Sequence, residues 1–394
     1  MTHEDELLTR AVTDVIPRKL ADEKLKFGKP LRIYLGIDPT GTKLHLGHSV
    51  PLRKLKAFAD AGHQVIFLIG SFTAMIGDPS GRDTMREPLT LEDTKRNFET
   101  YKKQAGKILD FSKVEIRYNH EWLEKLSMKD ILALTSHFTV QQMLKRDMFA
   151  KRMKEDAPIS VTEFMYPLMV GYDSVILDVD VELGGNDQLF NMLAGRTLQQ
   201  AFKKREKFVL TTKLIEGTDG RKMSKTYNNC VYLDDTPSEM YGKLLSMPDH
   251  LIPLYMECCT DFPMAEVKST EKALADGKEN PKNLKMRLAR EIVTMYHSAV
   301  DAKAAEESFE NLFKNKGVPE DMPEYKAKKG ELLVDALLAS SMVESKGEAR
   351  RLIEQGGMKV NDKTVTAIDA KAEGGIVKIG KRKFLQIIEF ADFH

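Results

Sequence analysis

Four basic side chains, placed in two short words far apart in the chain, have the types and spacing that suit phosphate chemistry. His45 and His48 stand in the word His-Leu-Gly-His, and Lys222 and Lys225 stand in Lys-Met-Ser-Lys-Thr. Imidazole and ammonium groups can neutralise charge on a polyphosphate, and Gly47 lets a nucleotide lie close to the backbone. Taken alone, the first word also fits two surface histidines at a helix start, and the second fits a solvated basic turn.

The elements around the first word favour the phosphate interpretation. Residues 31–37 are apolar and bounded by prolines, which predicts a buried strand, and an amphipathic helix follows and ends at Gly62. His45 and His48 lie three residues apart at the start of that helix, so their side chains share a face. A helix N-terminus offers free N–H groups and a positive dipole end to an anion.

The second word lies in a predicted flexible loop, because Gly217 and Gly220 stand just before its lysines. The chain contains neither the G-x-x-x-x-G-K-[ST] word of P-loop enzymes nor the G-x-G-x-x-G word of dinucleotide-binding enzymes. The sequence therefore argues against a P-loop enzyme and against a dinucleotide-binding enzyme. The pair of words in this order instead describes a site that moves adenylate groups.

The two words are similar to the HIGH and KMSKS words of class I aminoacyl-tRNA synthetases. The chain as a whole resembles the bacterial tyrosyl-tRNA synthetases, since further words occur in the family's order: Tyr34-x-Gly36-x-Asp38-Pro39-Thr40, Gly77-Asp78-Pro79-Ser80-Gly81, Tyr166 with Asp173, and Gly184-Gly185-x-Asp187-Gln188. This resemblance implies a tyrosine–tRNA ligase, a homodimer, whose partners are tRNA(Tyr), ATP and L-tyrosine.

The implied reaction is attack of a carboxylate on the α-phosphate of ATP, which expels pyrophosphate. Such a reaction requires positioning and charge neutralisation from the protein. The resemblance implies that His45 and His48 stabilise the α-phosphoryl region and that the departing pyrophosphate is held by Lys222, Lys225, Thr40, Arg82 and Arg86. It implies that ATP is bound also by Gly36, Asp38, Gly47 and Asp187, with Mg²⁺ on the phosphates, no tightly bound cofactor and no metal ligands of the protein.

The resemblance also assigns an amino-acid pocket. Tyr34, on the first strand, and Asp173, expected just before a strand at 175–182, hydrogen-bond the substrate's phenolic hydroxyl. The remaining positions serve the amino group or the carboxylate: Thr73, Asp78, Asn119, Tyr166 and Gln188. Asp78 before Pro79 could instead form a turn, and Tyr166 could belong to the core.

One position departs from the family's pattern. Val170 stands where the family usually has a glutamine that helps to bind the amino group, between Tyr166 and Asp173. Loss of one charge-assisted hydrogen bond would cost about 1.5–3 kcal/mol of amino-acid binding, unless a water molecule or a neighbouring side chain compensates. With valine at position 170, the protein could therefore be a variant of the family with altered amino-acid selectivity.

Composition indicates a cytoplasmic protein with no membrane partner. The 394 residues suggest two to three domains, and 60 basic against 59 acidic residues provide no global positive charge for RNA. Three cysteines without paired spacing argue against a disulfide framework or structural zinc. No stretch approaches the roughly 18 apolar residues that a membrane span requires.

The domain prediction has four parts. Residues 1–226 form an α/β, doubly wound parallel-sheet (Rossmann-like) catalytic domain, with a helical insertion at about 120–165 that the resemblance implies is the dimer interface. Residues 227–321 form an all-helical, anticodon-binding domain, 322–330 a linker, and 331–394 a small α+β RNA-binding domain. From residues alone, 120–165 could be an ordinary insertion.

Basic residues gather in the last 60 residues and could line one face for RNA phosphates. Acidic residues nearly balance them, so they could equally be a solvated charge run. The resemblance to the bacterial synthetases, which carry a ribosomal-protein-like RNA-binding domain at this end, favours RNA binding by Lys346, Arg350, Arg351, Lys381, Arg382 and Lys383.

Three alternatives remain at this point. A tryptophanyl enzyme shares the fold and both words, although Tyr34 with Asp173 suits a phenol better than an indole. An RNA-binding protein recruited from a synthetase would be expected to lose one of the two words, and both are present. A paralogue that charges another amino acid is suggested by Val170.

Overall fold

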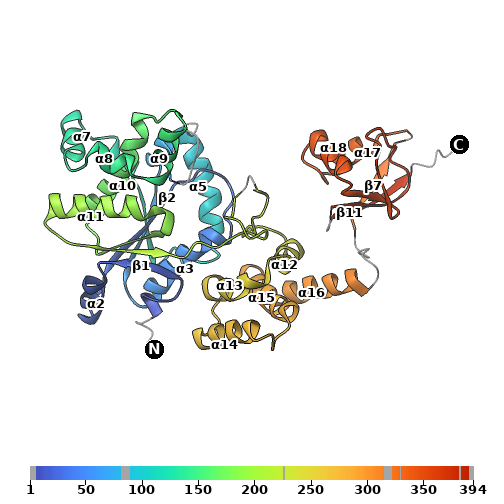
Figure 1. The fold of residues 1–394 in the computed structure, drawn as a ribbon, viewed down its shortest axis with the longest axis horizontal. Helices are drawn as coiled ribbons and strands as arrows, with labels where there is room; N and C mark the ends of the chain where they lie inside the picture. The colour runs from blue at the N-terminus through green and yellow to red at the C-terminus, as the bar shows by residue number, and fades with distance from the viewer. Residues whose placement is uncertain are drawn as a thin grey trace. The chain divides into compact units, whose positions relative to one another are not determined.

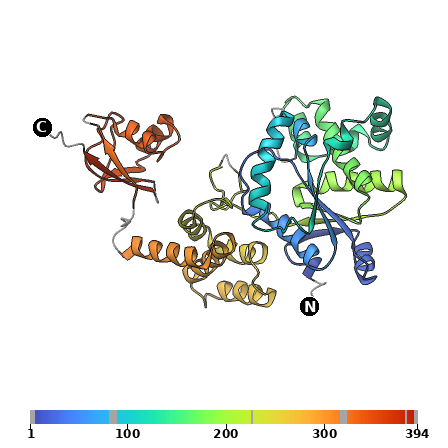
Figure 2. The same ribbon diagram turned by 180° about the vertical axis from the view of Figure 1, so that it is seen from behind.

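The structure is a computed structural model that describes residues 6–80, 89–224, 227–314, 322–328, 330–380 and 383–389. The chain divides into two compact units, Met1–Ala299 and Val300–His394 (Figures 1 and 2). Within the described ranges, no helix combines the length and the apolar character that a membrane crossing needs.

A six-stranded sheet with strand order β1-β6-β5-β2-β3-β4 forms the centre of the first unit. Strands β2 to β6 pair in parallel, while β1 pairs antiparallel with β6. The order reverses beside β2, which confirms the doubly wound prediction and opens a crevice at the carboxyl ends of β2 and β5. The strand bounds are Val12–Ile16, Arg32–Ile37, Gln64–Ile69, Val114–Tyr118, Val181–Gly185 and Phe208–Thr212.

Helices cover both faces of this sheet (Figure 1). The insertion predicted at 120–165 consists of short helices, several of which begin with a capping box, for example at Ser127 and Thr139. The bounds are α2 Arg18–Lys26, α3 Leu46–Asp60, α4 Thr73–Ile76, α5 Leu91–Ala105, α6 His120–Leu123, α7 Met128–Thr135, α8 Val140–Leu144, α9 Asp147–Lys154, α10 Val161–Leu177, the 3-10 turn η1 Asn186–Gln188, and α11 Leu189–Lys203.

One strand prediction was wrong, and it changes the setting of a site residue. The segment 175–182 was expected to be a strand, but α10 continues to Leu177 and β5 begins only at Val181. A short apolar run does not distinguish a buried helix from a buried strand. Asp173 therefore lies on the last turns of a helix, not before a strand.

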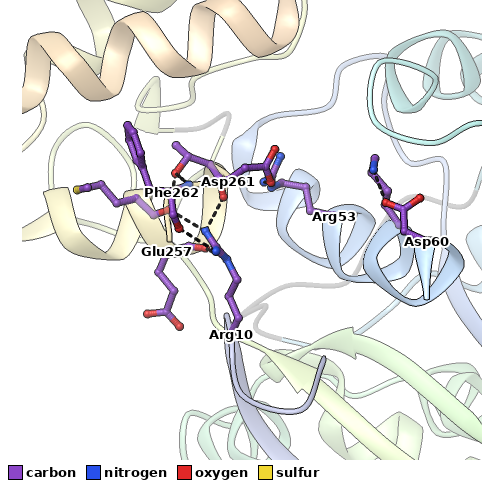
Figure 3. A network of polar contacts seen from close by, with 9 residues as sticks. Arg10, Arg53, Asp60, Glu257, Asp261 and Phe262 are labelled. Atoms are coloured by element: carbon purple, nitrogen blue, oxygen red, sulfur yellow. Dashed lines mark hydrogen bonds and ion pairs between the residues drawn. The ribbon is translucent and has the colours of Figure 1, made fainter. Parts of the chain in front are cut away.

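Helices α12 Pro237–Leu245, α13 Ile252–Cys259, α14 Met264–Ala275 and α15 Pro281–Tyr296 complete the first unit, with the 3-10 turn η3 Asp249–Leu251. A polar network ties the carboxyl end of α13 to the segment before β1 (Figure 3). The guanidinium group of Arg10 donates to the backbone carbonyls of Met256, Glu257, Thr260 and Phe262 at 2.7–3.4 Å. Met256 and Glu257 lie in the last turn of α13, where carbonyls lack an intrahelical N–H donor, and Thr260 and Phe262 follow the helix, so Arg10 joins the helix end to the segment after it.

The second unit has its own apolar core, which includes Leu333, Leu337, Val377 and Leu385. Its five strands are ordered β7-β11-β10-β8-β9. The segment 322–330, predicted to be a linker, contains β7, which pairs in parallel with β11, so this polar segment forms an edge strand of the small sheet. The bounds are α16 Ala299–Lys314, β7 Glu324–Ala327, α17 Leu333–Ala339, α18 Lys346–Glu354, β8 Met358–Val360, β9 Lys363–Thr364, β10 Gly375–Ile379 and β11 Lys383–Glu389.

Candidate active site

A cavity of about 340 Å³ lies at the carboxyl ends of β2 and β5. Its volume suits a small-molecule ligand. Arg82, Arg86 and Lys225 fall outside the described residues. All the other residues predicted for catalysis, ATP or amino-acid binding line this one cavity: Tyr34, Gly36, Asp38, Thr40, His45, Gly47, His48, Thr73, Asp78, Asn119, Tyr166, Val170, Asp173, Asp187, Gln188 and Lys222.

The two histidines cap helix α3 at one end of the cavity. His45 is the N-cap residue, and its Nδ1 accepts from the backbone N–H of Gly47 at 3.1 Å. The Nδ1 atom of His48 accepts from the backbone N–H of His45 at 3.2 Å. Because both Nδ1 atoms accept, each neutral ring carries its proton on Nε2 and acts there as a donor.

Gly47 is required for this arrangement of the two rings. A Cβ atom at position 47 would lie 2.9 Å from the ring of His45, which is closer than side chains tolerate. The ring centroids of His45 and His48 are 3.8 Å apart. The capping bonds therefore hold two imidazole donors side by side at a helix N-terminus, which is a favourable place for an anion.

Lys222 lies at the same end of the cavity and remains largely exposed. Its Nζ atom contacts Asp187 Oδ2 at 3.3 Å, and 57% of its side chain is exposed. The buried side chain of Asn229 fixes the loop around it, accepting from the Ser224 N–H at 2.8 Å and donating to the Lys222 carbonyl at 3.1 Å. The loop backbone is thus anchored while the ammonium group of Lys222 is available to a ligand.

Two carboxylates lie in the middle of the cavity. Asp38 accepts from Thr73 Oγ1 at 2.7 Å and from the hydroxyl of Tyr166 at 2.9 Å. Asp78 accepts from Gln188 Nε2 at 2.8 Å. Burial and the neighbouring Asp38 raise the pKa of Tyr166, so its hydroxyl stays protonated and donates. Asp38, predicted among the ATP ligands, therefore lies beside residues predicted for the amino acid.

The opposite end of the cavity is closed and polar. Tyr34 is 1% exposed and Asp173 is 2% exposed. Asp173 accepts from Trp122 Nε1 at 2.8 Å and from Asn119 Nδ2 at 3.2 Å. Burial raises the pKa of Asp173, and these two hydrogen bonds oppose the rise. Asn119, predicted to handle the amino group, thus holds Asp173 in place.

Val170 presents hydrocarbon to the cavity one helical turn after Tyr166. The side chain is half-buried and has no polar atom. At position 170, where the family usually has a glutamine that helps to bind the substrate's amino group, this chain therefore contributes only apolar surface. Asp38 and Asp78, which line the same cavity, supply hydrogen-bond acceptors.

Several polar residues around the cavity were not predicted from the sequence. Trp122 bonds Asp173, Asn191 donates to Gln188 Oε1 at 2.8 Å, and Arg146 donates to Ser80 Oγ at 2.8 Å. A second group, Ser174, Glu182 and Lys207, lies behind Tyr34. Glu182 gave a usable signal, because a charged residue inside an otherwise apolar strand needs a buried partner.

The predicted RNA-binding residues of the second unit are mostly exposed. Arg350 and Arg351 on α18 are exposed. Lys346 pairs with Asp335 at 2.6 Å, and Lys383 Nζ donates to the carbonyl of Met342 at 3.0 Å. Lys381 and Arg382 lie outside the described residues.

Two family models match the chain. Residues 26–314 match the model for class I tRNA synthetases (W and Y), and residues 314–387 match the SYY-like C-terminal domain of tyrosine–tRNA ligases. The first model covers most of the first unit, including the cavity.

Curated relatives and solved structures agree with the family models. The tyrosine–tRNA ligase of Thermotoga maritima is 44% identical over 393 residues, 98% of each chain, and that of Carboxydothermus hydrogenoformans is 45% identical over 399 residues, 97% of each. A C-terminally truncated mitochondrial tyrosyl-tRNA synthetase of Aspergillus nidulans superposes with a TM-score of 0.64 at 25% identity, covering 79% of this chain and 93% of that one. A tyrosyl-tRNA synthetase of Archaeoglobus fulgidus shares the fold, with a TM-score of 0.62 at 22% identity over 77% of this chain and 99% of that one.

Proposed function

Because the chain belongs to the class I tRNA synthetases of the tryptophan and tyrosine group, we propose that its cavity joins tyrosine to ATP as tyrosyl-adenylate and then transfers tyrosine to tRNA. The chain is a tyrosine–tRNA ligase, as are its curated relatives. The observation that carries the assignment of the site is that one cavity has a buried polar end at Tyr34 and Asp173 and a basic end at His45, His48 and Lys222.

The basic end suits the phosphates of ATP. The Nε2 atoms of His45 and His48 can donate to the α-phosphate oxygens, where negative charge increases as the carboxylate attacks. Lys222 can neutralise the departing pyrophosphate, with Thr40, Arg82, Arg86 and Lys225 as the further predicted contacts. Asp187, which now accepts from Lys222, is predicted to bind the ribose hydroxyls of ATP when the lysine turns to phosphate.

The middle and the buried end suit tyrosine. Its ammonium group can bind the acceptors Asp38 and Asp78, which Thr73, Tyr166 and Gln188 hold in position. Its phenol reaches Tyr34 and Asp173, where an apolar ring end would leave buried polar groups unpaired. This polarity distinguishes tyrosine from phenylalanine, and the pairing of Tyr34 with Asp173 suits a phenol better than an indole.

ATP is expected to bring Mg²⁺ with it. Among the described residues, no group of three or more histidine, cysteine, aspartate or glutamate side chains converges to form a metal site. Mg²⁺ usually keeps several waters and binds through substrate phosphates, so we propose that it sits on the phosphate oxygens of ATP without metal ligands from the protein. The ion would neutralise charge on the phosphates, while the protein's own side chains orient them.

The second unit is proposed to bind the body of the tRNA and the helical segment 227–321 its anticodon side. Arg350 and Arg351 share the exposed side of α18, and such cations bind RNA phosphates. Deleting residues 331–394 should leave tyrosine activation unchanged and weaken tRNA charging about tenfold at physiological salt. Equal charging by the shortened and full-length chains would contradict the RNA role.

A homodimer is proposed through the insertion, about residues 120–165. Large apolar side chains there are exposed to an extent that a monomer does not require: Met128 71%, Leu132 61%, Val140 59%, Met153 60% and Val161 77%. Apolar surface of this kind is usually covered by a partner, and a second copy is the commonest one. Analytical ultracentrifugation should find a dimer and a shift toward monomer for Leu132→Glu, whereas a monomeric wild type would contradict the proposal.

The reaction is proposed to occur in the cytoplasm, where ATP and tRNA are found together. The direct test of the function is aminoacylation with radiolabelled tyrosine and bacterial tRNA(Tyr), beside tryptophan and tRNA(Trp) as the matched control. We expect charging of tRNA(Tyr) with tyrosine alone. Charging with tryptophan, or none with either, would contradict the proposal.

A further inference from the structure

The loop that carries Lys222 is joined to the rest of the protein by backbone pairing on both of its sides. Before the loop, Glu216 pairs with Lys222 as an isolated antiparallel β-bridge. After the loop, Tyr232 forms a bridge of the same kind with His45. The position of Lys222 therefore depends on what holds Glu216 at the entrance of the loop and on the histidine word at its exit.

A tyrosine of the helical segment holds the entrance of the loop. Tyr255, on α13, is fully buried, and its hydroxyl donates to the backbone carbonyl of Glu216 at 2.5 Å. Burial raises the pKa of Tyr255, so the hydroxyl stays protonated and able to donate. Tyr255 therefore fixes the residue that pairs with Lys222, although 39 residues separate Tyr255 from Glu216 in the sequence.

A second side chain of α13 holds the segment that leads into the loop. Glu257 accepts from Lys213 Nζ at 2.7 Å through one carboxylate oxygen and from the backbone N–H of Ala11 at 2.8 Å through the other. The Glu257 side chain is 11% exposed, and Lys213 lines the cavity. Helix α13 thus contacts the chain between β6 and the loop at two points, Lys213 and Glu216.

Helix α13 is in turn fixed by two arginines that reach its carboxyl end (Figure 3). Arg10 donates to carbonyls of the last turn and of the residues after it. Arg53, on the histidine helix α3, pairs with Asp261 at 2.5 Å. Because α3 begins just after His45, the helix that holds the Lys222 loop is connected to the helix that holds the two histidines.

We propose that Tyr255 is a positioning residue for adenylate formation, because its hydrogen bond to Glu216 places Lys222 at the phosphate end of the cavity. Glu257 supports the same placement by holding Lys213. This inference rests on the proposed function, since it concerns how Lys222 meets the departing pyrophosphate. Tyr255 does not belong to the described lining of the cavity, so it acts through the loop and not on the substrate.

The exposure of Lys222 explains why such an anchor matters. Its side chain is 57% exposed, and a lysine stem is long and flexible, so its own contacts do little to place the ammonium group. A charged group lowers a barrier most when it is preorganised toward the place where charge develops. Asn229 orders the interior of the loop, and Tyr255 fixes the loop to α13, so together they supply this preorganisation through the backbone.

The test is the single-turnover rate of tyrosyl-adenylate formation by full-length Tyr255→Phe, which loses one oxygen and keeps its ring. We expect the rate constant to fall about tenfold, with KM for tyrosine within about twofold of the wild type, because only the phosphate end is disturbed. Glu257→Gln keeps the size of its side chain and should lower the rate about threefold, with KM for tyrosine again unchanged.

A double-mutant cycle shows whether the hydroxyl acts through Lys222. Tyr255→Phe should slow the wild type about tenfold and slow Lys222→Ala by less than about threefold, because the second protein has no ammonium group left to place. Equal slowing in both backgrounds would overturn the positioning role, since the effect would then not pass through Lys222. If Tyr255→Phe does not fold, Glu257→Gln is placed in the same cycle, where its effect should likewise shrink in Lys222→Ala.

Tyr241 provides a matched control for the loss of a buried hydroxyl. It is as fully buried as Tyr255, but it lies on α12, which packs against α15. Tyr241→Phe should leave the rate of adenylate formation at its wild-type value, even if thermal stability falls. An equal loss of rate in Tyr241→Phe and Tyr255→Phe would overturn the specific role of Tyr255.

Failure of this inference and failure of the proposed function give different results. An unchanged rate in Tyr255→Phe, with an active wild type, would overturn the positioning role and leave the proposed function standing. A wild type that forms no tyrosyl-adenylate would instead overturn the proposed function itself.

Discussion

The two ends of the cavity differ in how far their polar side chains are buried and hydrogen-bonded within the protein. At the phenol end, Tyr34 and Asp173 are at most 2% exposed, and both are hydrogen-bonded to other side chains. At the phosphate end, Lys222 keeps 57% of its side chain exposed, with one carboxylate at 3.3 Å. The phenol end is therefore built before the substrate arrives, while the phosphate end offers charges whose best partners are the substrate's.

This difference assigns different kinetic roles to the two ends. Contacts that exist in the ground state set the binding of tyrosine and appear in KM. Contacts that strengthen as charge builds up on the phosphates appear in kcat. Substitutions at the two ends should therefore separate KM from kcat.

The largest effect is expected at the phosphate end. Lys222→Ala should lower kcat for adenylate formation by about 10²–10³, because a charge-stabilising donor is lost in the transition state. KM for tyrosine should stay within about twofold, as measured by pyrophosphate exchange. Arg221→Ala, at the neighbouring exposed residue that pairs with Asp219, is the matched control. A tenfold rise in KM with normal kcat for Lys222→Ala would contradict the different kinetic roles of the two ends of the cavity.

The next effect is expected at the phenol end. Asp173→Ala should raise KM for tyrosine by roughly 30–150-fold, the equivalent of about 2–3 kcal/mol, because Trp122, Asn119 and the phenol lose a shared acceptor. Discrimination against phenylalanine should collapse. Asp180→Ala removes another buried carboxylate, which pairs with Lys24, and should lower stability only. Retained discrimination in Asp173→Ala would sink the assignment of Asp173.

A smaller effect should come from the middle of the cavity. Val170→Gln supplies an acceptor near the substrate's amino group and should lower KM for tyrosine about tenfold with kcat unchanged, the equivalent of about 1.4 kcal/mol. Ile176→Gln, on the outer side of the same helix at 38% exposure, is the control. If Val170→Gln instead switches the preferred amino acid, this position sets selectivity and not affinity.

The smallest effect on activity is expected for a substitution of Lys54, on the helix that carries His48. The same substitution should change the stability of the protein measurably. Lys54, on α3, is buried and donates to the carbonyls of Glu6 and Leu7, both at 3.1 Å. Burial lowers the pKa of Lys54 from 10.5 to about 8. The unfolded chain therefore binds more protons between pH 8 and 10.5, so the contribution of Lys54 to the free energy of unfolding rises with pH across this interval.

Urea unfolding at pH 7.5 and 9.5 tests this sign. Relative to Lys54→Met, the wild type should gain about 2 kcal/mol between these two pH values. Tyrosine activation at pH 7.5 should stay within about twofold in the variant. Parallel stability profiles of the two proteins would show that Lys54 keeps an ordinary pKa.

The sequence predicted the first parallel strand, β2, and the histidine helix because each has a strong local pattern. β2 and β3 are largely apolar runs between turn residues, and α3 has an apolar face that ends near Gly62. The edge strand β1 lacks such a run, since Asp14 interrupts it, and its pairing with β6 depends on residues nearly 200 positions away. The end of α10 was misplaced because its last turns are as apolar as a strand.

The candidate site was predictable where residues carry a motif, and not where they act through one another. His45, Lys222 and Asp187 were found because they lie in recognisable words. Lys207 was missed because its partners Ser174 and Glu182 lie 33 and 25 residues away, and only the packing around Gly195 brings them together. Contacts between residues on different helices and strands depend on tertiary packing, which local sequence patterns do not encode.

The most direct test of a prebuilt phenol end is pyrophosphate exchange by the wild type with tyrosine, phenylalanine and tryptophan measured side by side. We predict exchange with tyrosine, and discrimination against phenylalanine that resides in KM and not in kcat. Comparable KM values for tyrosine and phenylalanine, or exchange with tryptophan, would contradict it.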